Sequence, residues 1–242
     1  MTIAVSGTDP TSDLGSVPRN VIVEGTRARA RADGRHAWSG SVGDVAEYAA
    51  VVLAGGSGRR LGGPGKPRLE VGGVPMLARV LAAVADAAPR VVVGPASLAT
   101  ALPPGVVLTC ERPHGSGPVA AASAGLALIP PGTPCVALLA ADLPFLTTAA
   151  VVALRCALAG DSTVDGALFV DTDGRAQVLC GVWRAGALRA NLAALGDPAG
   201  QPVRRLLAGL RTAELPWADP GPPPWYDCDT ESDLRTAREW AT

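Results

Sequence analysis

The sequence YAAVVLAGGSGRRLGGPGK, at residues 48–66, determines which fold we expect. It opens with seven apolar residues and continues into two glycines, Gly55 and Gly56. A short apolar run is typical of a parallel strand that is buried on both faces of a sheet. Glycines after such a strand let backbone N–H groups approach phosphate oxygens, and the arginines and Lys66 add positive charge. The stretch therefore predicts a buried strand followed by a phosphate-binding loop.

Apolar runs and helical patterns alternate along the rest of the chain. The expected strands lie at residues 90–94, 106–111, 135–141, 167–170 and 178–183, and the expected helices at residues 75–88, 118–129, 147–159, 203–210 and 231–240. This alternation predicts an α/β fold in which helices sandwich a Rossmann-like, mainly parallel sheet. Ligands of such sheets bind beyond the carboxyl ends of the strands, where Gly55-Gly56, Glu111 and Asp142 are expected.

Residues 1–46 differ in composition from the rest of the chain. They are rich in Ser, Thr, Gly and Asp, and five acidic residues balance five basic ones. A segment of this composition buries too little apolar surface to fold alone. We expect residues 1–46 to be a poorly ordered N-terminal extension and residues 47–242 to form a single domain.

Composition argues against several classes of protein. The chain has 242 residues, 48% of them hydrophobic, and a net charge of −1. That balance argues against binding to nucleic acid or to a membrane surface, and no apolar run approaches the ~20 residues of a membrane helix. The five cysteines form no CxxC pair, and the two histidines form no HExxH site. With no secretory signal visible, we expect a cytoplasmic protein with reduced thiols.

Two well-known phosphate loops do not fit the glycine-rich stretch. A Walker A motif requires Ser or Thr after its Gly-Lys pair, but Pro67 follows Lys66. The dinucleotide fingerprint GxGxxG fails by one position, because Leu61 stands where its third glycine is required. Lys66 is itself unusual, since the 21 basic residues are 20 arginines and this one lysine. A compact ammonium on a flexible stem fits between crowded phosphate oxygens where a planar guanidinium does not.

The loop resembles the LAGGxSxRMGxxxK signature of the MobA-type molybdenum cofactor guanylyltransferases, a family of nucleotidyltransferases. The matching residues are Leu53, Ala54, Gly55, Gly56, Arg60, Gly62 and Lys66. Four further segments are similar in the same order, and they begin at Gly117 (GPVA), Asp142 (DLPFL), Leu179 (LCGVWR) and Asp227 (DCDT, followed by Asp233-Leu234). The resemblance covers residues 47 to about 240, and it implies a sheet of the nucleotide-diphospho-sugar transferase type.

The resemblance also implies a reaction and its partners. The terminal phosphate of molybdopterin attacks the α-phosphorus of GTP, pyrophosphate leaves, and the guanine dinucleotide form of the cofactor results. Mg²⁺ is the implied cofactor, GTP and molybdopterin are the small-molecule partners, and the proteins that deliver molybdopterin are expected to make transient contact. Transfers of this kind depend on alignment and charge neutralisation more than on side-chain acids or bases.

Roles for individual residues follow from the same match. The implied catalytic residues are Lys66, Arg60 and Asp142, and the implied nucleotide-binding residues are Leu53, Ala54, Gly55, Gly56, Lys66, Glu111 and Asp142. Asp142 is the expected principal ligand of Mg²⁺, because this ion takes one or two carboxylates together with substrate phosphates. Asp227 and Asp229 face the same side of an extended segment, and Asp229 matches the family position that faces the metal.

The nucleotide base is predicted less directly. Gly55 and the Gly117-Pro118 pair favour GTP, because cytidylyl-transferring relatives usually carry LAAG. Two departures bear on the same site, namely Glu111 in place of the family's Asp and Gly94 in place of its Asn. One alternative is a related enzyme that uses CTP or another nucleotide with a phosphorylated small-molecule or sugar-phosphate acceptor. Another is a nucleotide-binding module without catalysis.

Overall fold

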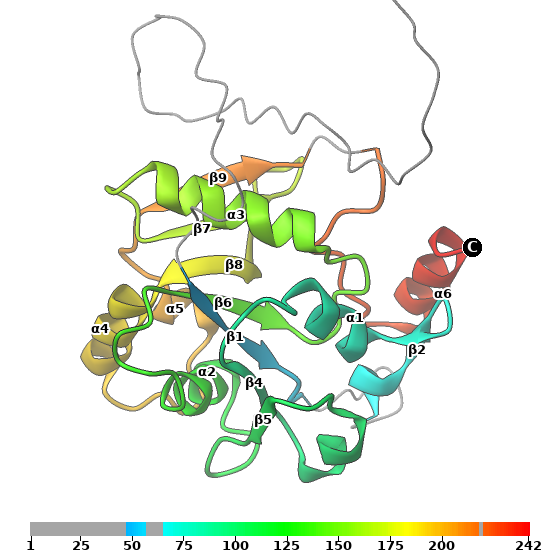
Figure 1. The fold of residues 1–242 in the computed structure, drawn as a ribbon, viewed down its shortest axis with the longest axis horizontal. Coiled ribbons are helices and arrows are strands. Elements are labelled where there is room, and N and C mark those ends of the chain that lie inside the picture. Colours follow the sequence, from blue (N-terminus) through cyan, green and yellow to red (C-terminus); the bar gives the residue numbers. More distant parts are fainter. Residues whose placement is uncertain (1–46, 57–64, 218–219) are drawn as a thin grey trace, which may run out of the picture.

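The computed structural model describes residues 47–56, 65–217 and 220–242, and a seven-stranded sheet lies at their centre (Figure 1). The order of its strands is β5-β4-β1-β6-β8-β7-β9. Their bounds are β1 Tyr48–Leu53, β4 Arg90–Val93, β5 Val106–Thr109, β6 Cys135–Ala140, β7 Gly166–Val170, β8 Ala176–Arg184 and β9 Thr212–Pro216. Only β8 runs antiparallel to its neighbours in this sheet. The mainly parallel Rossmann-like sheet expected from the sequence is confirmed.

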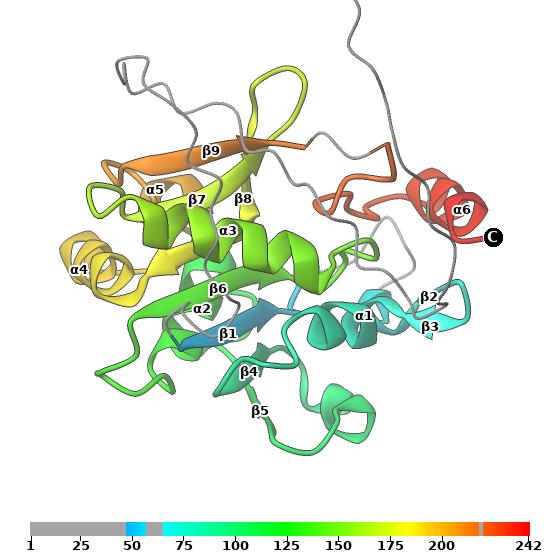
Figure 2. The same cartoon turned by 45° about the horizontal axis from the view of Figure 1, so that its top comes forward.

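Helices cover both faces of the sheet. Helices α1 (Met76–Ala83) and α3 (Thr148–Gly160) pack on one face. Helices α2 (Pro118–Leu126), α4 (Ala185–Leu195) and α5 (Val203–Leu206) pack on the other (Figures 1 and 2). The whole of β1 is buried, because its alternate side chains enter the two cores. This burial explains why the sequence of β1 is apolar without alternation.

A small structural unit beside the main sheet is built from distant parts of the chain. The 3-10 helix η3 (Lys66–Arg68) leads into the two-stranded hairpin β2 (Glu70–Val71) and β3 (Val74–Pro75). Helix α6 (Glu231–Trp240) lies next to this hairpin (Figures 1 and 2). The hairpin and α6 share a small core, which consists of Val71, Met76, Cys228, Leu234 and Ala237. The packing holds the C-terminal segment close to the end of β6.

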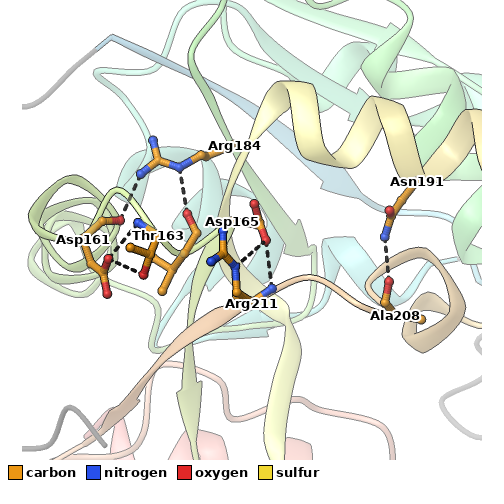
Figure 3. Close-up of polar contacts among 8 residues, drawn as sticks. Asp161, Thr163, Asp165, Arg184, Asn191, Ala208 and Arg211 are labelled. Carbon is orange, nitrogen blue, oxygen red and sulfur yellow. Dashed lines mark hydrogen bonds and ion pairs between the residues drawn. The ribbon is translucent and has the colours of Figure 1, made fainter. Parts of the chain in front are cut away.

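Polar contacts link the end of β8 to the segments that lead into β7 and β9, as Figure 3 shows. The Arg184 guanidinium donates to the carbonyl oxygens of Val164, Leu158 and Asp161 at 2.8, 3.1 and 3.1 Å. Asp165 accepts the backbone N–H of Arg211 at 2.9 Å. Since Arg184 is paired in register with Cys135, the first residue of β6, this edge is opposite the one where β6 leads into Asp142.

Several element boundaries differ from the expected ones. The helix expected at 75–88 ends at Ala83, where Val84 leaves helical geometry with φ −117°. The third strand ends at Thr109, and the helix expected at 203–210 is the short α5. A second 3-10 helix, η4 (Ala96–Ala101), follows β4. The expected extension at residues 1–46 lies outside the described residues, so its interpretation stays a prediction. None of the helices that are described has the length and apolar character needed to cross a bilayer.

Candidate functional site

Three side chains from separate elements meet at the carboxyl edge of the sheet. Asp142 follows β6, Lys66 begins η3, and Asp229 immediately precedes the N-cap of α6. The Lys66 ammonium is ion-paired with Asp142 Oδ2 and lies 2.5 Å from Asp229 Oδ1. Lys66 and Asp229 are 163 positions apart in the chain. Folding therefore places the single lysine between two carboxylates.

Local backbone contacts hold each of these side chains in place. Gly65 provides the N-cap of η3 and buried Pro67 lies in its first turn, so Lys66 starts a short, fixed helix. The N–H of Cys228 donates to the carbonyl oxygen of Asp142 at 3.3 Å, which ties the C-terminal segment to the end of β6. Thr230 caps α6 and forms a capping box with Asp233. Asp229 is thus held between an anchored residue and a helix cap.

Burial and charge act in opposite directions on Lys66. The side chains of Lys66 and Asp142 are 16% and 18% exposed, whereas that of Asp229 is 58% exposed. Burial alone would lower the pKa of Lys66, but hydrogen bonds and charge from Asp142 and then Asp229 outweigh it and raise the pKa. Lys66 is therefore a charged ammonium at neutral pH. Charge-assisted contacts of this kind are stronger than neutral hydrogen bonds.

Asp227 is a third carboxylate near the pair. Partial burial of its carboxyl group, followed by the charges of Asp229 and Asp142, raises the pKa of Asp227 to about 6, although much of the residue is exposed. The carboxylates therefore repel one another when no further cation is present. The sequence indicated that either Asp227 or Asp229 could face a metal, and the structure gives the ammonium contact to Asp229.

Glu111 lies against the first part of the glycine-rich loop. Its residue is only 9% exposed, and its Oε1 accepts the N–H of Gly115 at 2.9 Å. A Cβ atom placed on Gly55 would lie 3.9 Å from each carboxylate oxygen of Glu111, whereas one on Gly56 would meet none of the described residues within 4 Å. The glycine pair therefore borders a buried carboxylate on the side of Gly55.

Backbone hydrogen bonds fix the segment before the glycine pair. The N–H of Ala54 donates to Val93 at 2.8 Å, and the carbonyl oxygen of Leu53 accepts from Ala141 at 3.0 Å. The implied nucleotide-binding residues Leu53, Ala54, Gly55 and Gly56 thus continue directly from β1 to the edge that holds Asp142. Arg60, the remaining implied catalytic residue, lies in residues 57–64, outside the described part of the chain.

Gly94 explains one departure from the family pattern. A Cβ atom at this position would lie 3.0 Å from Leu98 Cδ1 and 3.2 Å from both the carbonyl carbon and the Cβ of Ala54. An Asn side chain therefore fits here only if Leu98 and the residue at the end of β1 shift by a few tenths of an ångström. The resemblance alone did not reveal this, because the constraint comes from the close packing of β4, η4 and the end of β1.

The carboxylate pair suits a divalent cation. Asp142 and Asp229 offer the oxygen ligands that Mg²⁺ prefers, and their oxygens already converge on one cation, the Lys66 ammonium. Among the described residues, no group of three or more His, Cys, Asp or Glu side chains could hold a metal ion without help. Two carboxylates completed by substrate phosphates are a common arrangement for this ion.

The fold and this edge define a class of protein. A doubly covered, mainly parallel sheet, with a glycine pair after its inner strand and a lysine between aspartates, is typical of proteins that bind and transfer nucleotides. Residues 50–215 match the MobA-like NTP transferase domain, and the chain belongs to this family. The protein is therefore an enzyme of the nucleotidyltransferase class, which confirms the resemblance seen in the sequence.

Individual relatives agree with the family assignment. A molybdenum cofactor guanylyltransferase from Bradyrhizobium sp. (strain ORS 278) is 30% identical over 203 residues, which cover 79% of this chain and 92% of the relative. The structure of molybdopterin-guanine dinucleotide biosynthesis protein A from Archaeoglobus fulgidus has a TM-score of 0.60 at 20% identity, covering 78% of this chain and 96% of that one. That of 2-C-methyl-D-erythritol 4-phosphate cytidylyltransferase from Thermus thermophilus has a TM-score of 0.57 at 21% identity, covering 81% and 98%. The structural likeness concerns the fold alone, which proteins named for different nucleotides share.

Proposed function

We propose that this enzyme transfers GMP from GTP to molybdopterin in a Mg²⁺-dependent reaction that releases pyrophosphate. The observation that carries the proposal is the meeting of Lys66 with Asp142 and Asp229 beside the Gly55-Gly56 pair. The name of the Bradyrhizobium relative supports molybdopterin as the acceptor and GTP as the donor.

Each residue of the site has a defined task in this reaction. Backbone N–H groups of the glycine-rich loop, with the Lys66 ammonium and Arg60, hold the β- and γ-phosphates of GTP as they become pyrophosphate. Asp142 and Asp229 would hold Mg²⁺, which supplies Lewis-acid polarisation of the α-phosphate. A phosphate oxygen of molybdopterin forms the new bond to the α-phosphorus, and the bond from that phosphorus to the bridging β-phosphate oxygen breaks. The protein contributes no nucleophile, so alignment and charge are its main contributions.

Glu111 supports the choice of guanine. Its buried carboxylate lies beside Gly55, and among the described residues it accepts one N–H, that of Gly115. A carboxylate accepts several hydrogen bonds, and the adjacent ring N–H and amino group of guanine offer two donors on one edge. The edge of cytosine offers its single amino group beside an acceptor nitrogen. A buried acceptor at this position therefore favours guanine.

The location and partner proteins follow from the same proposal. All five cysteines are free thiols, which supports a reducing cytoplasm. Molybdopterin is expected to arrive through transient contacts with the proteins that deliver it. Nucleic acid and membranes have no place in this function.

The proposal is tested by offering the purified protein each of the four nucleoside triphosphates with Mg²⁺ and molybdopterin. Pyrophosphate release is measured, and the product is identified by mass spectrometry. We expect turnover with GTP and formation of the guanine dinucleotide. Turnover with CTP alone would instead support the alternative cytidylyl-type reaction. An absence of turnover with every nucleotide and acceptor would support a binding module without catalysis.

A further inference from the structure

The Lys66 ammonium touches the same two carboxylates that the proposed function gives to Mg²⁺. It is ion-paired with Asp142 Oδ2 and with Asp229 Oδ1. An ammonium has three N–H donors, and two of them are used by these contacts. The proposed function also needs this ammonium at the phosphates of the nucleotide. The two positions compete for one side chain.

Three arginines of the neighbouring elements donate to backbone carbonyl oxygens. The guanidinium of Arg68 donates to the carbonyl oxygen of Ser97, that of Arg79 to Val71, and that of Arg238 to Glu70. Asp142 is largely buried, so leaving its charge unpaired would be costly. Repulsion from the neighbouring carboxylates adds to that cost. Lys66, which is ion-paired with both Asp142 and Asp229, reduces both costs.

We propose that Lys66 is the counter-ion of Asp142 and Asp229 before the divalent cation binds. The cation then takes the position of the ammonium, and Lys66 is released to the nucleotide. The proposal rests on the proposed function for the identity of the cation. A divalent ion with two positive charges replaces one ammonium at Asp142 and Asp229. The flexible four-carbon stem of lysine lets the ammonium leave while η3 stays in place. An arginine would keep its charge but would carry a bulky, planar group into the same space.

The exchange makes cation binding and nucleotide binding cooperative. In the absence of nucleotide, a divalent ion must displace Lys66 without giving it a new partner, so the ion binds weakly. When the nucleotide is present, its phosphates receive the ammonium and the ion binds more tightly. By reciprocity, the ion raises the affinity for the nucleotide by the same factor. Lys66 thus links the two events.

The test measures Mn²⁺ binding without nucleotide, using the electron paramagnetic resonance signal of free Mn²⁺. The variants are Lys66→Met and Lys66→Gln, and the matched control is Arg68→Met, which removes a positive charge from the same short helix. If Lys66 holds the carboxylates for all but about a tenth of the time, its removal strengthens Mn²⁺ binding about tenfold. Arg68→Met should change the affinity by less than about twofold, because its charge is screened by salt.

Two results would overturn the proposal. Equal Mn²⁺ affinities in the wild type and both Lys66 variants would show that Lys66 does not compete with the cation. Equal gains in the Lys66 variants and Arg68→Met would show that general loss of positive charge is sufficient. Thermal unfolding provides a second readout, because Mg²⁺ should raise the melting temperature more in Lys66→Met than in the wild type.

Failure of this proposal is distinguishable from failure of the proposed function. If the wild type forms the guanine dinucleotide and Lys66→Met leaves the Mn²⁺ affinity unchanged, the proposed function is supported and the counter-ion role is refuted. If Lys66→Met binds Mn²⁺ more tightly but the wild type does not turn over GTP, the counter-ion role is supported and the proposed reaction is refuted.

Discussion

Gly125 allows α2 to pack directly on the sheet, and replacing it with alanine should destabilise the protein. A Cβ atom at this position would lie 2.4 Å from Val51 Cγ1 and 3.1 Å from Val93 Cγ2. Both valines are fully buried in neighbouring strands, so neither side chain has space to move away. Alanine improves helix propensity by about 1 kcal/mol, whereas overpacking of a rigid core costs about 1–3 kcal/mol. A contact of 2.4 Å puts the cost at the upper end, and we expect a net loss of about 2 kcal/mol.

A second glycine in a helix provides the control. Gly186 lies in the first turn of α4 and is exposed, and a Cβ atom there would meet no atom of the described residues within 4 Å. Gly186→Ala should therefore stabilise the protein by about 0.5–1 kcal/mol, through helix propensity and a less flexible unfolded chain. Thermal and urea unfolding should show a stability shift of opposite sign in the two variants. The melting temperature of Gly125→Ala should be about 4–8 °C lower than that of the wild type. A melting temperature for Gly125→Ala equal to or above the wild type would refute the packing argument.

Three further changes test the site and its support. Asp142→Asn should lower kcat for pyrophosphate release by about 10²–10³-fold, because it removes an anionic ligand of the Mg²⁺ that would polarise the α-phosphate. A loss below tenfold at unchanged stability would contradict its role. Asp227→Asn tests the raised pKa of about 6. A carboxyl group whose pKa is higher in the folded state stabilises the fold when protonated and loses that contribution as the pH rises through about 6. In EDTA the free energy of unfolding of the variant should exceed that of the wild type by about 1 kcal/mol at pH 7.5, a value reduced for solvent screening, and by little at pH 4.5. Equal shifts in melting temperature at both pH values would contradict this. Arg184→Met should lower the free energy of unfolding in urea by about 2–3 kcal/mol, since three carbonyl oxygens lose their donor. The KM for GTP should stay unchanged, because the candidate site lies at the opposite edge of the sheet. A raised KM would show that the two edges are coupled.

The central strands were predictable because their burial leaves a continuous apolar pattern. Tyr48–Leu53 and Cys135–Ala140 match their expected strands within a residue. Elements at the periphery lack such a signal. Helix α4 follows β8 directly at Arg184, without a turn residue to mark the change. Strand β9 is short and mostly exposed or half-buried, and the hairpin strands have two residues each.

The candidate site was predictable where it follows from topology. Parallel strands end at one edge, so the approach of the glycine-rich loop to Asp142 could be expected from their order. The pairing of Lys66 with Asp229 could not, because it depends on the Cys228 backbone contact and on the packing of α6 against the hairpin. The tight contacts at Gly94 were equally hidden, since they arise from atoms of different elements. The roles assigned to these residues stay predictions.

Lys66 and Asp229 are far apart in the sequence, and this has a consequence for protein synthesis. A nascent chain presents the glycine-rich loop and Asp142 outside the ribosome well before the segment around Cys228 emerges. At that stage the ammonium has only one of its two acidic partners, and α6 has not yet covered the β2–β3 hairpin. The acidic pair is therefore completed late during translation, because a chain that ends ahead of residue 229 carries Asp142 without its second acidic partner.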